Sequence, residues 1–198
     1  MARPKHTGGP ARPLELREVK RLIAVTSNSG RNRKRNTILI KTLIYTAGRI
    51  SEVLYLKVSD VWDGNSVNPS LVFRKTKTKH TRRIPINSNF ASDLKEYITS
   101  SNLKLTDPLI PSTRPVKGDY HINPTAGSLL VKRLMEAAGI MDCSAHSTRK
   151  FALTHMLRNN VNLRTISAVS GHRSAASLER YLYTSTPEIQ DAIETINF

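Results

Sequence analysis

The sequence predicts an α+β fold that is mainly helical and carries a small antiparallel β-sheet. Apolar residues near the N-terminus recur at helical spacing, as in Leu16, Val19, Leu22 and Ile23. Short segments rich in Val and Ile lie between residues 57 and 87, bounded by Asp-Gly, Asn-Pro and polar runs. From residue 88 onward, helical patterns return, with Ser, Asn or Thr at their starts and Gly at several of their ends.

The front of the chain predicts three helices. The spacing predicts a helix over residues 14–26, which the polar stretch 29–36 interrupts. Residues 37–48 are apolar on most faces and are expected to form a helix in the centre of the core. Gly48 allows a sharp turn, and a short helix resumes over residues 49–56.

The rest of the chain predicts a sheet followed by helices. Three antiparallel strands are expected over residues 57–62, 66–73 and 82–87, with residues 75–81 as the loop of the second hairpin. Helices are then expected over residues 88–100, 123–139, 146–160, 162–171, 174–184 and 186–196. No internal repeat is visible, so we expect one domain.

The charge balance points to a polyanionic partner. Thirty-one Lys and Arg residues stand against fifteen Asp and Glu residues, a net charge of +16. Residues 1–35 hold ten basic and two acidic side chains, and residues 73–83 hold six basic side chains and no acidic one. We expect nucleic acid rather than a membrane surface or an anionic protein, because no basic amphipathic helix with exposed Trp or Phe is visible.

Other classes of protein are disfavoured by composition. No apolar run approaches the ~18 residues that a membrane span requires, and no apolar segment follows the basic N-terminus as in a secretory signal. Cys143 is the single cysteine, so an internal disulfide is excluded and a reducing cytoplasm is expected. The residue spacings of zinc sites are absent, so no metal is expected.

Six residues are candidates for chemistry on a phosphate-rich partner. His146 and Arg149 lie one helical turn apart, so their side chains share a face. The full set is Arg49, Lys77, His146, Arg149, His172 and Tyr181.

Each candidate also has a structural interpretation. Arg49 near a helix start is suited to an ion pair with Glu52, and His172 to a helix cap. Tyr181 or Tyr183 is suited to anchoring its helix in the core. The lysines of the hairpin loop are suited to a solvated basic edge that discourages aggregation; they are Lys75, Lys77 and Lys79.

Taken as a set, these residues resemble the tyrosine recombinase (phage integrase) family. The most specific stretches are GRISEVLYLKVSDV, from Gly48, and HSTRKFALTHMLRNNVNLRTISAVSGHRSAASLERYLYTS, from His146. The resemblance covers about residues 14–186 and implies the catalytic-domain fold of that family. It also implies a site-specific recombinase that cleaves and rejoins duplex DNA through a 3′-phosphotyrosyl intermediate, in integration, excision or inversion.

The resemblance implies a role for each candidate residue. Arg49 and Arg149 would each donate two hydrogen bonds to the non-bridging oxygens of the scissile phosphate. His146 and His172 would donate a hydrogen bond or accept the phenolic proton of Tyr181, the nucleophile. Lys77, which lies eight positions before the proline that closes the third strand, would protonate the departing 5′ oxygen. No metal, ATP or other cofactor is implied.

Three motifs depart from the usual pattern of the family. The usual Thr-Gly-x-Arg is TAGR, with the glycine one place late, and the usual His-x-Leu-Arg is HSTR. The usual Leu-Gly-His is SGH, with Ser170 in place of leucine. None of these changes removes a catalytic group. Most members carry a separate helical domain that these 198 residues do not contain, so we expect a minimal recombinase, with a truncated chain as the alternative.

The expected organisation is a flexible basic arm over residues 1–12 and a catalytic domain over residues 13–198. The segment 186–198 packs either on its own domain or on a neighbouring subunit. The side chains expected to bind DNA are Lys75, Lys79, Arg82, Arg33, Lys34 and Arg35. The expected partners are double-stranded DNA with specific target sites, further copies of the chain in a tetramer, and accessory DNA-bending proteins.

Two further functions stay open from the sequence. One is a type IB-like topoisomerase or resolvase, which uses the same chemistry without exchanging partners. The other is a non-catalytic DNA-binding regulator on this fold, which is disfavoured because every expected polar group is present. The expected location is the cytoplasm of a bacterium or archaeon, or of a phage-infected cell, in association with the nucleoid.

Overall fold

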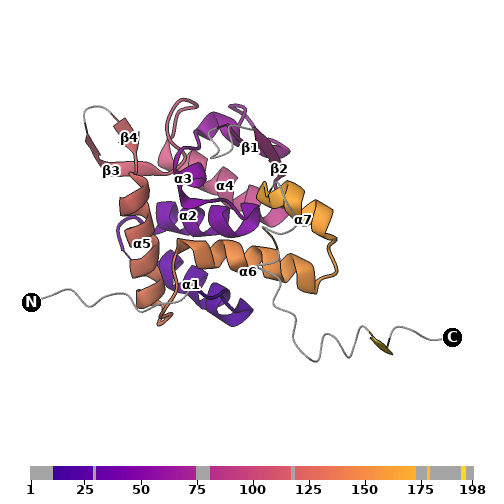
Figure 1. Ribbon diagram of the computed structural model, residues 1–198. Coiled ribbons are helices and arrows are strands. Elements are labelled where there is room, and N and C mark those ends of the chain that lie inside the picture. Colours follow the sequence, from indigo (N-terminus) through magenta and orange to yellow (C-terminus); the bar gives the residue numbers. More distant parts are fainter. Residues whose placement is uncertain are drawn as a thin grey trace, which may run out of the picture.

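The computed structural model describes residues 11–28, 30–74, 81–116, 119–172, 178 and 193–194. Its helices gather around α2 (Arg33–Thr46), which packs against α1 (Leu16–Asn28), α4 (Ser88–Ser101) and α6 (Ala145–Arg158). In Figure 1, α2 and α6 run side by side through the middle of the molecule, with α5 (Pro124–Ala137) across one end. The predicted class, mainly helical with antiparallel β-structure, is confirmed.

Helix α2 is central because it is apolar on most of its surface. Ile38, Leu39, Ile40 and Leu43 are all buried, and they face different neighbours around the helix. The predicted central position is therefore confirmed. The helix begins at Arg33 rather than at residue 37, because Arg and Lys are good helix formers whose charged ends reach solvent from the first turn.

The prediction of three strands is partly wrong. Residues 57–62 form a 3-10 turn, η1 (Val58–Asp60), with only isolated bridges from Lys57 to Pro108 and from Trp62 to Val67. The Asp60 carboxylate accepts a hydrogen bond from the Lys57 backbone N–H at 2.9 Å, which favours the turn over an extended strand. The other two strands are confirmed as β1 (Ser70–Phe73) and β2 (Arg82–Pro85), an antiparallel pair.

A second hairpin was missed by sequence reasoning. Strands β3 (Pro111–Val116) and β4 (Asp119–His121) pair antiparallel and extend from the body of the molecule beside α5 (Figure 1). The two prolines of β3 argue against a strand, but a two-stranded ribbon tolerates proline because its outer edge needs no donor.

Polar residues cap the starts of four helices, and at α4 the cap is Asn87, one residue before the predicted start at Ser88. Asn87, Asn123, Ser144 and Asn162 lie at the N-caps of α4, α5, α6 and α7 (Leu163–Ser170), and each side chain accepts a backbone N–H. Gly171 closes α7 with a φ of 71°, as the predicted glycine stop requires. The predicted helices over 174–184 and 186–196 lie outside the described residues, apart from buried Leu178 and exposed Ile193 and Glu194.

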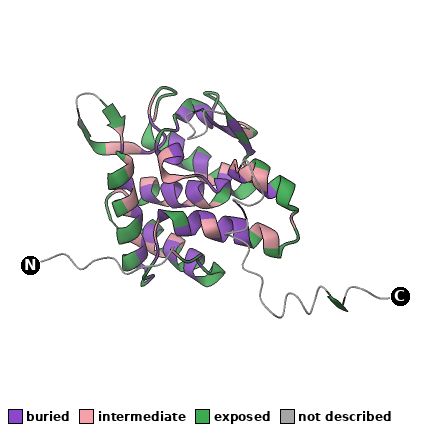
Figure 2. Cartoon of the chain, viewed as in Figure 1, coloured by how far each residue is buried: buried purple, intermediate pink, exposed green. Residues whose placement is uncertain are grey.

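The core lies where the helices face one another. Figure 2 shows buried residues on the inner faces of the helices and exposed residues on their outer faces. The short α3 (Ile50–Leu54) joins this core through Val53 and Leu54, which are fully buried. None of the helices in the described part of the chain combines the length and hydrophobicity that a membrane span requires.

Candidate active site

Arg49 lies at the turn between α2 and α3. Ala47 caps α2 in the left-handed conformation, with a φ of 47°, and Gly48 follows it. A Cβ on Gly48 would lie 2.8 Å from the Val53 side chain and 3.0 Å from the Phe73 ring. The glycine at position 48 is therefore required by close packing. Arg49 then serves as the N-cap residue of α3.

Glu52 fixes the orientation of Arg49. Its carboxylate accepts the Arg49 backbone N–H at 3.0 Å and the Arg49 Nη1–H at 2.9 Å. Glu52 is 3% exposed, whereas the Arg49 side chain retains 28% exposure. The ion pair that the sequence offered as an alternative is thus present, and it leaves Arg49 at the surface of the site.

Arg82 is predicted from the sequence to contact DNA, but its side chain is buried in the protein. It is only 8% exposed, donates to Glu52 Oε2 at 2.9 Å and stacks over the Phe73 ring at 4.7 Å. Arg82 shares the inward face of β2 with Ile84, since residues alternate between the two faces of a strand. That alternation was the sequence signal for its burial. One carboxylate therefore holds two guanidinium groups, Arg49 and Arg82.

Arg149, on α6, lies beneath Arg49 and Arg82 and links α6 to the ends of α2 and α7. From α6 it donates through Nη1 to the Ala47 carbonyl and through Nη2 to the Ser170 carbonyl at 2.8 Å. Its side chain is fully buried, with 1% exposure. Because both acceptors are carbonyls at the ends of helices, Arg149 satisfies groups that the helices cannot satisfy themselves.

His172 lies beside Arg149, directly after the glycine that ends α7. Its Nδ1 lies 2.7 Å from Ser170 Oγ, and its Nε2 lies 3.3 Å from Arg149 Nη2. Burial, together with the charges of Arg149, Arg49 and Arg82, lowers the pKa of His172 to about 4. The imidazole is therefore neutral at pH 7.

His146 lies in the first turn of α6, on the same helix as Arg149. Ser144 caps this turn by accepting the His146 backbone N–H at 3.3 Å, while the imidazole side chain reaches the surface. Partial desolvation and the charge of Arg149 lower the pKa of His146 below its usual value. Four candidate residues predicted from the sequence are thus gathered in one place, namely Arg49, His146, Arg149 and His172.

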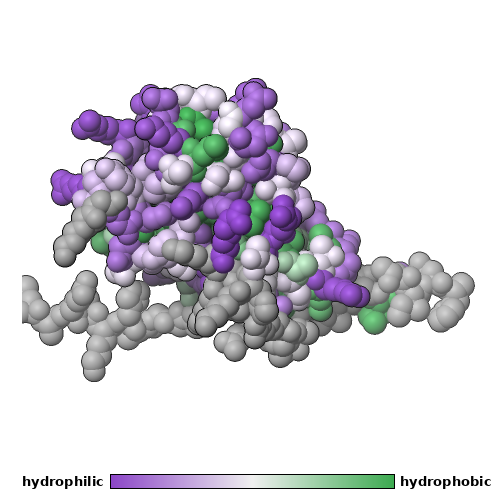
Figure 3. Space-filling view, turned by 90° about the horizontal axis from the view of Figure 1, so that it is seen from above, coloured by the Kyte–Doolittle hydropathy of each residue, from purple (hydrophilic) through white to green (hydrophobic). Residues whose placement is uncertain are grey.

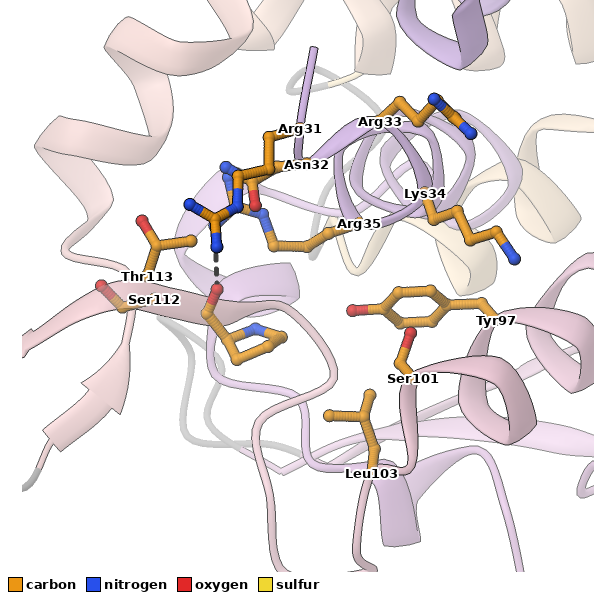
Figure 4. Close-up of a pocket in the computed structure, with 11 residues that line it drawn as sticks. Arg31, Asn32, Arg33, Lys34, Arg35, Tyr97, Ser101, Leu103, Ser112 and Thr113 are labelled. Atoms are coloured by element: carbon orange, nitrogen blue, oxygen red, sulfur yellow. Dashed lines mark hydrogen bonds between the residues drawn. The ribbon is translucent and has the colours of Figure 1, made fainter.

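The remaining candidates are in other places. Lys77 and Tyr181, and the loop residues Lys75 and Lys79, lie outside the described residues. Arg33, Lys34 and Arg35 lie at the start of α2 beside a pocket (Figure 4). Arg33 and Lys34 point away from β3, whereas Arg35 folds back and donates to the Pro111 carbonyl at 3.0 Å.

Two contributors were not recognised in the sequence. Glu52 appeared only as a possible ion-pair partner, and Ser170 only as a departure from a motif. The three-residue spacing from Arg49 to Glu52 is that of a capping box, which was the available signal for Glu52. Across the described ranges, no group of three or more His, Cys, Asp or Glu side chains is arranged to hold a metal ion.

Comparison with known proteins places this arrangement in a family. The model of the phage integrase family matches residues 12–187. Tyrosine recombinase XerA of Pyrococcus horikoshii is 28% identical over 178 residues, which cover 89% of this chain and 58% of that protein. Tyrosine recombinase XerC of Halalkalibacterium halodurans is 27% identical, over 90% of this chain and 59% of that protein. The chain thus spans less than two thirds of the length of these curated relatives.

Solved structures support the same fold. The crystal structure of XerA recombinase superposes with a TM-score of 0.76 and 23% identity, covering 100% of this chain and 68% of that one. A structure of XerH site-specific recombinase gives a TM-score of 0.70 and 21% identity, covering 96% of this chain and 54% of that one. The fold is therefore that of tyrosine recombinase catalytic domains, and this chain belongs to the phage integrase family.

Proposed function

We propose that this chain is the DNA-cleaving part of a site-specific recombinase that cleaves and rejoins duplex DNA. The observation that carries the proposal is the convergence of Arg49, Arg149 and His172 from three segments far apart in the sequence. Family membership supports it, as do the relatives, which are named tyrosine recombinases. The XerH structure is described as bound to a palindromic difH substrate after cleavage.

The scissile phosphate would enter where the site reaches the surface. Arg49 is partly exposed and the His146 side chain is exposed, whereas Arg149 lies beneath them. Arg49 and Arg149 would stabilise the charge that develops on the equatorial oxygens as phosphorus becomes five-coordinate. Glu52 and the Ala47 carbonyl hold these guanidinium groups in place before DNA arrives, so little reorganisation is needed during the reaction.

The bond changes follow from the groups present in the sequence. The Tyr181 hydroxyl oxygen would attack phosphorus while its proton passes to an imidazole, His172 or His146. The bond from phosphorus to the 5′ oxygen would break, with Lys77 protonating that oxygen. The resulting 3′-phosphotyrosyl bond is a phosphodiester, so a 5′ hydroxyl from another strand can reverse the step and join the strands without an external energy source.

Binding of the duplex would rest on the basic surface. Hydrophilic side chains cover much of the described surface in the view of Figure 3. Arg33 and Lys34 are exposed at the start of α2, about 20 Å along that helix from Arg49, so they suit contacts to flanking phosphates. Lys75 and Lys79 are proposed to contact DNA beside Lys77. Arg35 donates a hydrogen bond to the Pro111 carbonyl, so it would support the start of α2 rather than bind DNA.

The organisation of the full assembly follows the same proposal. Residues 13–198 would form the catalytic domain, with residues 1–12 as a cationic arm along the DNA. Arg12, at the end of this arm, is anchored by two hydrogen bonds to the Glu18 carboxylate. We propose a tetramer on DNA, with residues 186–198 packing on a neighbouring subunit and with DNA-bending proteins as accessory partners.

A trapping experiment tests the proposed function. The protein is incubated with a pool of randomised, nicked DNA duplexes, in which the cleaved end diffuses away and leaves the covalent adduct trapped. We expect an adduct that maps to Tyr181 by peptide mass spectrometry, that is lost in Tyr181→Phe and that is retained in the matched control Tyr183→Phe. Recovery of a common sequence supports site-specific recombination.

Two outcomes would contradict the proposal. Adducts on all sequences alike would indicate a topoisomerase-like activity in place of site-specific recombination. An absence of adduct from the unmodified protein, with DNA still bound, would indicate a regulator on this fold.

A further inference from the structure

Ser170 occupies a position that sequence reasoning did not assign to the chemistry. It is the last residue of α7 and is fully buried, with 0% exposure. Its hydroxyl lies 2.7 Å from His172 Nδ1, and its backbone carbonyl accepts a hydrogen bond from Arg149. One residue therefore touches both the imidazole and the buried guanidinium group of the site.

The hydrogen-bonding groups around His172 determine which ring nitrogen carries the proton. A guanidinium group only donates, so at 3.3 Å from Arg149 Nη2 the His172 Nε2 atom must accept. In a neutral imidazole the proton is then on Nδ1, which donates to Ser170 Oγ. The Ser170 hydroxyl donates in turn to the Ser167 carbonyl at 3.3 Å, so its own lone pairs are available to Nδ1.

The alternative tautomer is disfavoured by the same contacts. A proton on Nε2 would face the N–H groups of Arg149, and Nδ1 would require the Ser170 hydroxyl to turn away from Ser167. Burial of a hydroxyl group is unfavourable unless it is hydrogen-bonded, and the buried Ser170 hydroxyl meets this condition by donating to the Ser167 carbonyl and accepting from His172 Nδ1.

We propose that Ser170 is a positioning residue that fixes His172 in the Nδ1–H tautomer and keeps the lone pair of Nε2 directed toward the phosphate-binding guanidinium group of Arg149. The consequence for the reaction rests on the proposed function: with its lone pair on Nε2, His172 accepts a hydrogen bond from Arg149 Nη2 and helps to hold this guanidinium group for the scissile phosphate. Burial, together with the charges of Arg149, Arg49 and Arg82 and with His146, keeps this imidazole neutral before DNA binds.

The tautomer can be measured without DNA. Long-range ¹H–¹⁵N NMR spectra distinguish protonated from unprotonated ring nitrogens, and the His172 signals are assigned with His172→Gln. We expect an Nδ1–H tautomer at pH 7 in the unmodified protein. Ser170→Ala should convert His172 to a mixture or to the Nε2–H form, because alanine keeps the backbone carbonyl that holds Arg149 and removes only the hydroxyl group.

Ser167→Ala is the matched control. It lies one turn earlier on α7 and contacts Ser170 through its backbone carbonyl, which alanine retains. Its spectrum should match that of the unmodified protein. An Nε2–H tautomer in the unmodified protein, or an unchanged tautomer in Ser170→Ala, would overturn the proposal.

A second readout addresses the reaction. Single-turnover cleavage of a duplex recovered from the randomised pool should slow about tenfold in Ser170→Ala at saturating DNA, the effect expected for one lost hydrogen bond, with DNA affinity unchanged. Cleavage by Ser170→Ala at the unmodified rate would overturn its role in the reaction. If the unmodified protein forms no adduct at all, the proposed function fails, whereas the tautomer measurement still decides the role of Ser170.

Discussion

Helix α2 has a cationic region at each end, and the two regions differ in burial and in partners. At its start, Arg33 and Lys34 are exposed, and Lys34 contacts Ser100 and Glu96 at the surface. At its end, Arg82 and Arg149 are buried and donate to a carboxylate and to backbone carbonyls.

The difference shows that basic side chains serve two purposes in this fold, attraction of a polyanion and stabilisation of a transition state. Exposed cations attract a polyanion over a distance, but salt screens them and their side chains keep their rotational freedom. Buried guanidinium groups with fixed acceptors have lost that freedom on folding, so they are preorganised for a transition state. The start of α2 therefore suits binding, and its end suits chemistry.

The largest expected effect on stability comes from the carboxylate at the buried end. Glu52→Gln would leave Arg82 and Arg49 without their counter-charge, which should lower the free energy of unfolding by about 3–5 kcal/mol. The matched change at the exposed end, Glu96→Gln, removes a surface partner of Lys34 and should cost less than about 1 kcal/mol. Urea unfolding of both variants checks the comparison, and equal losses would contradict it.

Acid should lower the free energy of unfolding, first through His172 near the buried end of α2. The pKa of His172 is lowered from 6.5 to about 4, so between these values the unfolded chain binds a proton that the folded chain does not. Stability should therefore fall as the pH is lowered from 6.5 toward 4. The lowered pKa of Glu18, about 2, adds a further loss below pH 4.5.

Urea unfolding at a series of pH values measures this dependence. His172→Gln should reduce the slope between pH 6.5 and 4, because its side chain does not titrate. An unchanged slope in His172→Gln would show that the imidazole is not held neutral by its surroundings.

The smallest expected effects are at the exposed end and are seen in the salt dependence of DNA binding. Arg33→Gln and Lys34→Gln should each reduce the slope of log affinity against log salt by about 1, the value for one phosphate contact. Arg82→Met should leave the slope unchanged, because its side chain is buried. Fluorescence anisotropy with a labelled duplex measures the slopes, and a change confined to Arg82→Met would reverse the assignment of the two regions.

Much of the fold was predictable where local sequence and tertiary packing agree. Apolar residues around α2 predicted its central position, and the Asn-Pro pair at Asn123 predicted the start of α5. The strand predicted over residues 57–62 failed because the Asp60 side chain stabilises a local turn in place of pairing. The β3–β4 hairpin was missed because a projecting ribbon tolerates prolines that a central strand excludes.

The site was predictable as a set of residues but not in its supporting contacts. Motif spacing identified Arg49, His146, Arg149 and His172, which the structure brings together. The burial of Arg82 depends on which face of β2 meets the core, and the basic run around residues 73–83 does not reveal this. The contact of Ser170 with His172 depends on the left-handed turn at Gly171, which a motif does not describe.

The most direct test of the comparison measures cleavage rate and DNA affinity separately in two variants. Arg149→Lys alters the buried end, and the double variant Arg33→Gln, Lys34→Gln alters the exposed end. We expect Arg149→Lys to cleave about 10²–10³-fold more slowly at saturating DNA with nearly unchanged affinity, and the double variant to bind more weakly yet cleave at a normal rate once saturated. Equal losses of rate and affinity in both variants would contradict the division of α2 into a binding end and a chemical end.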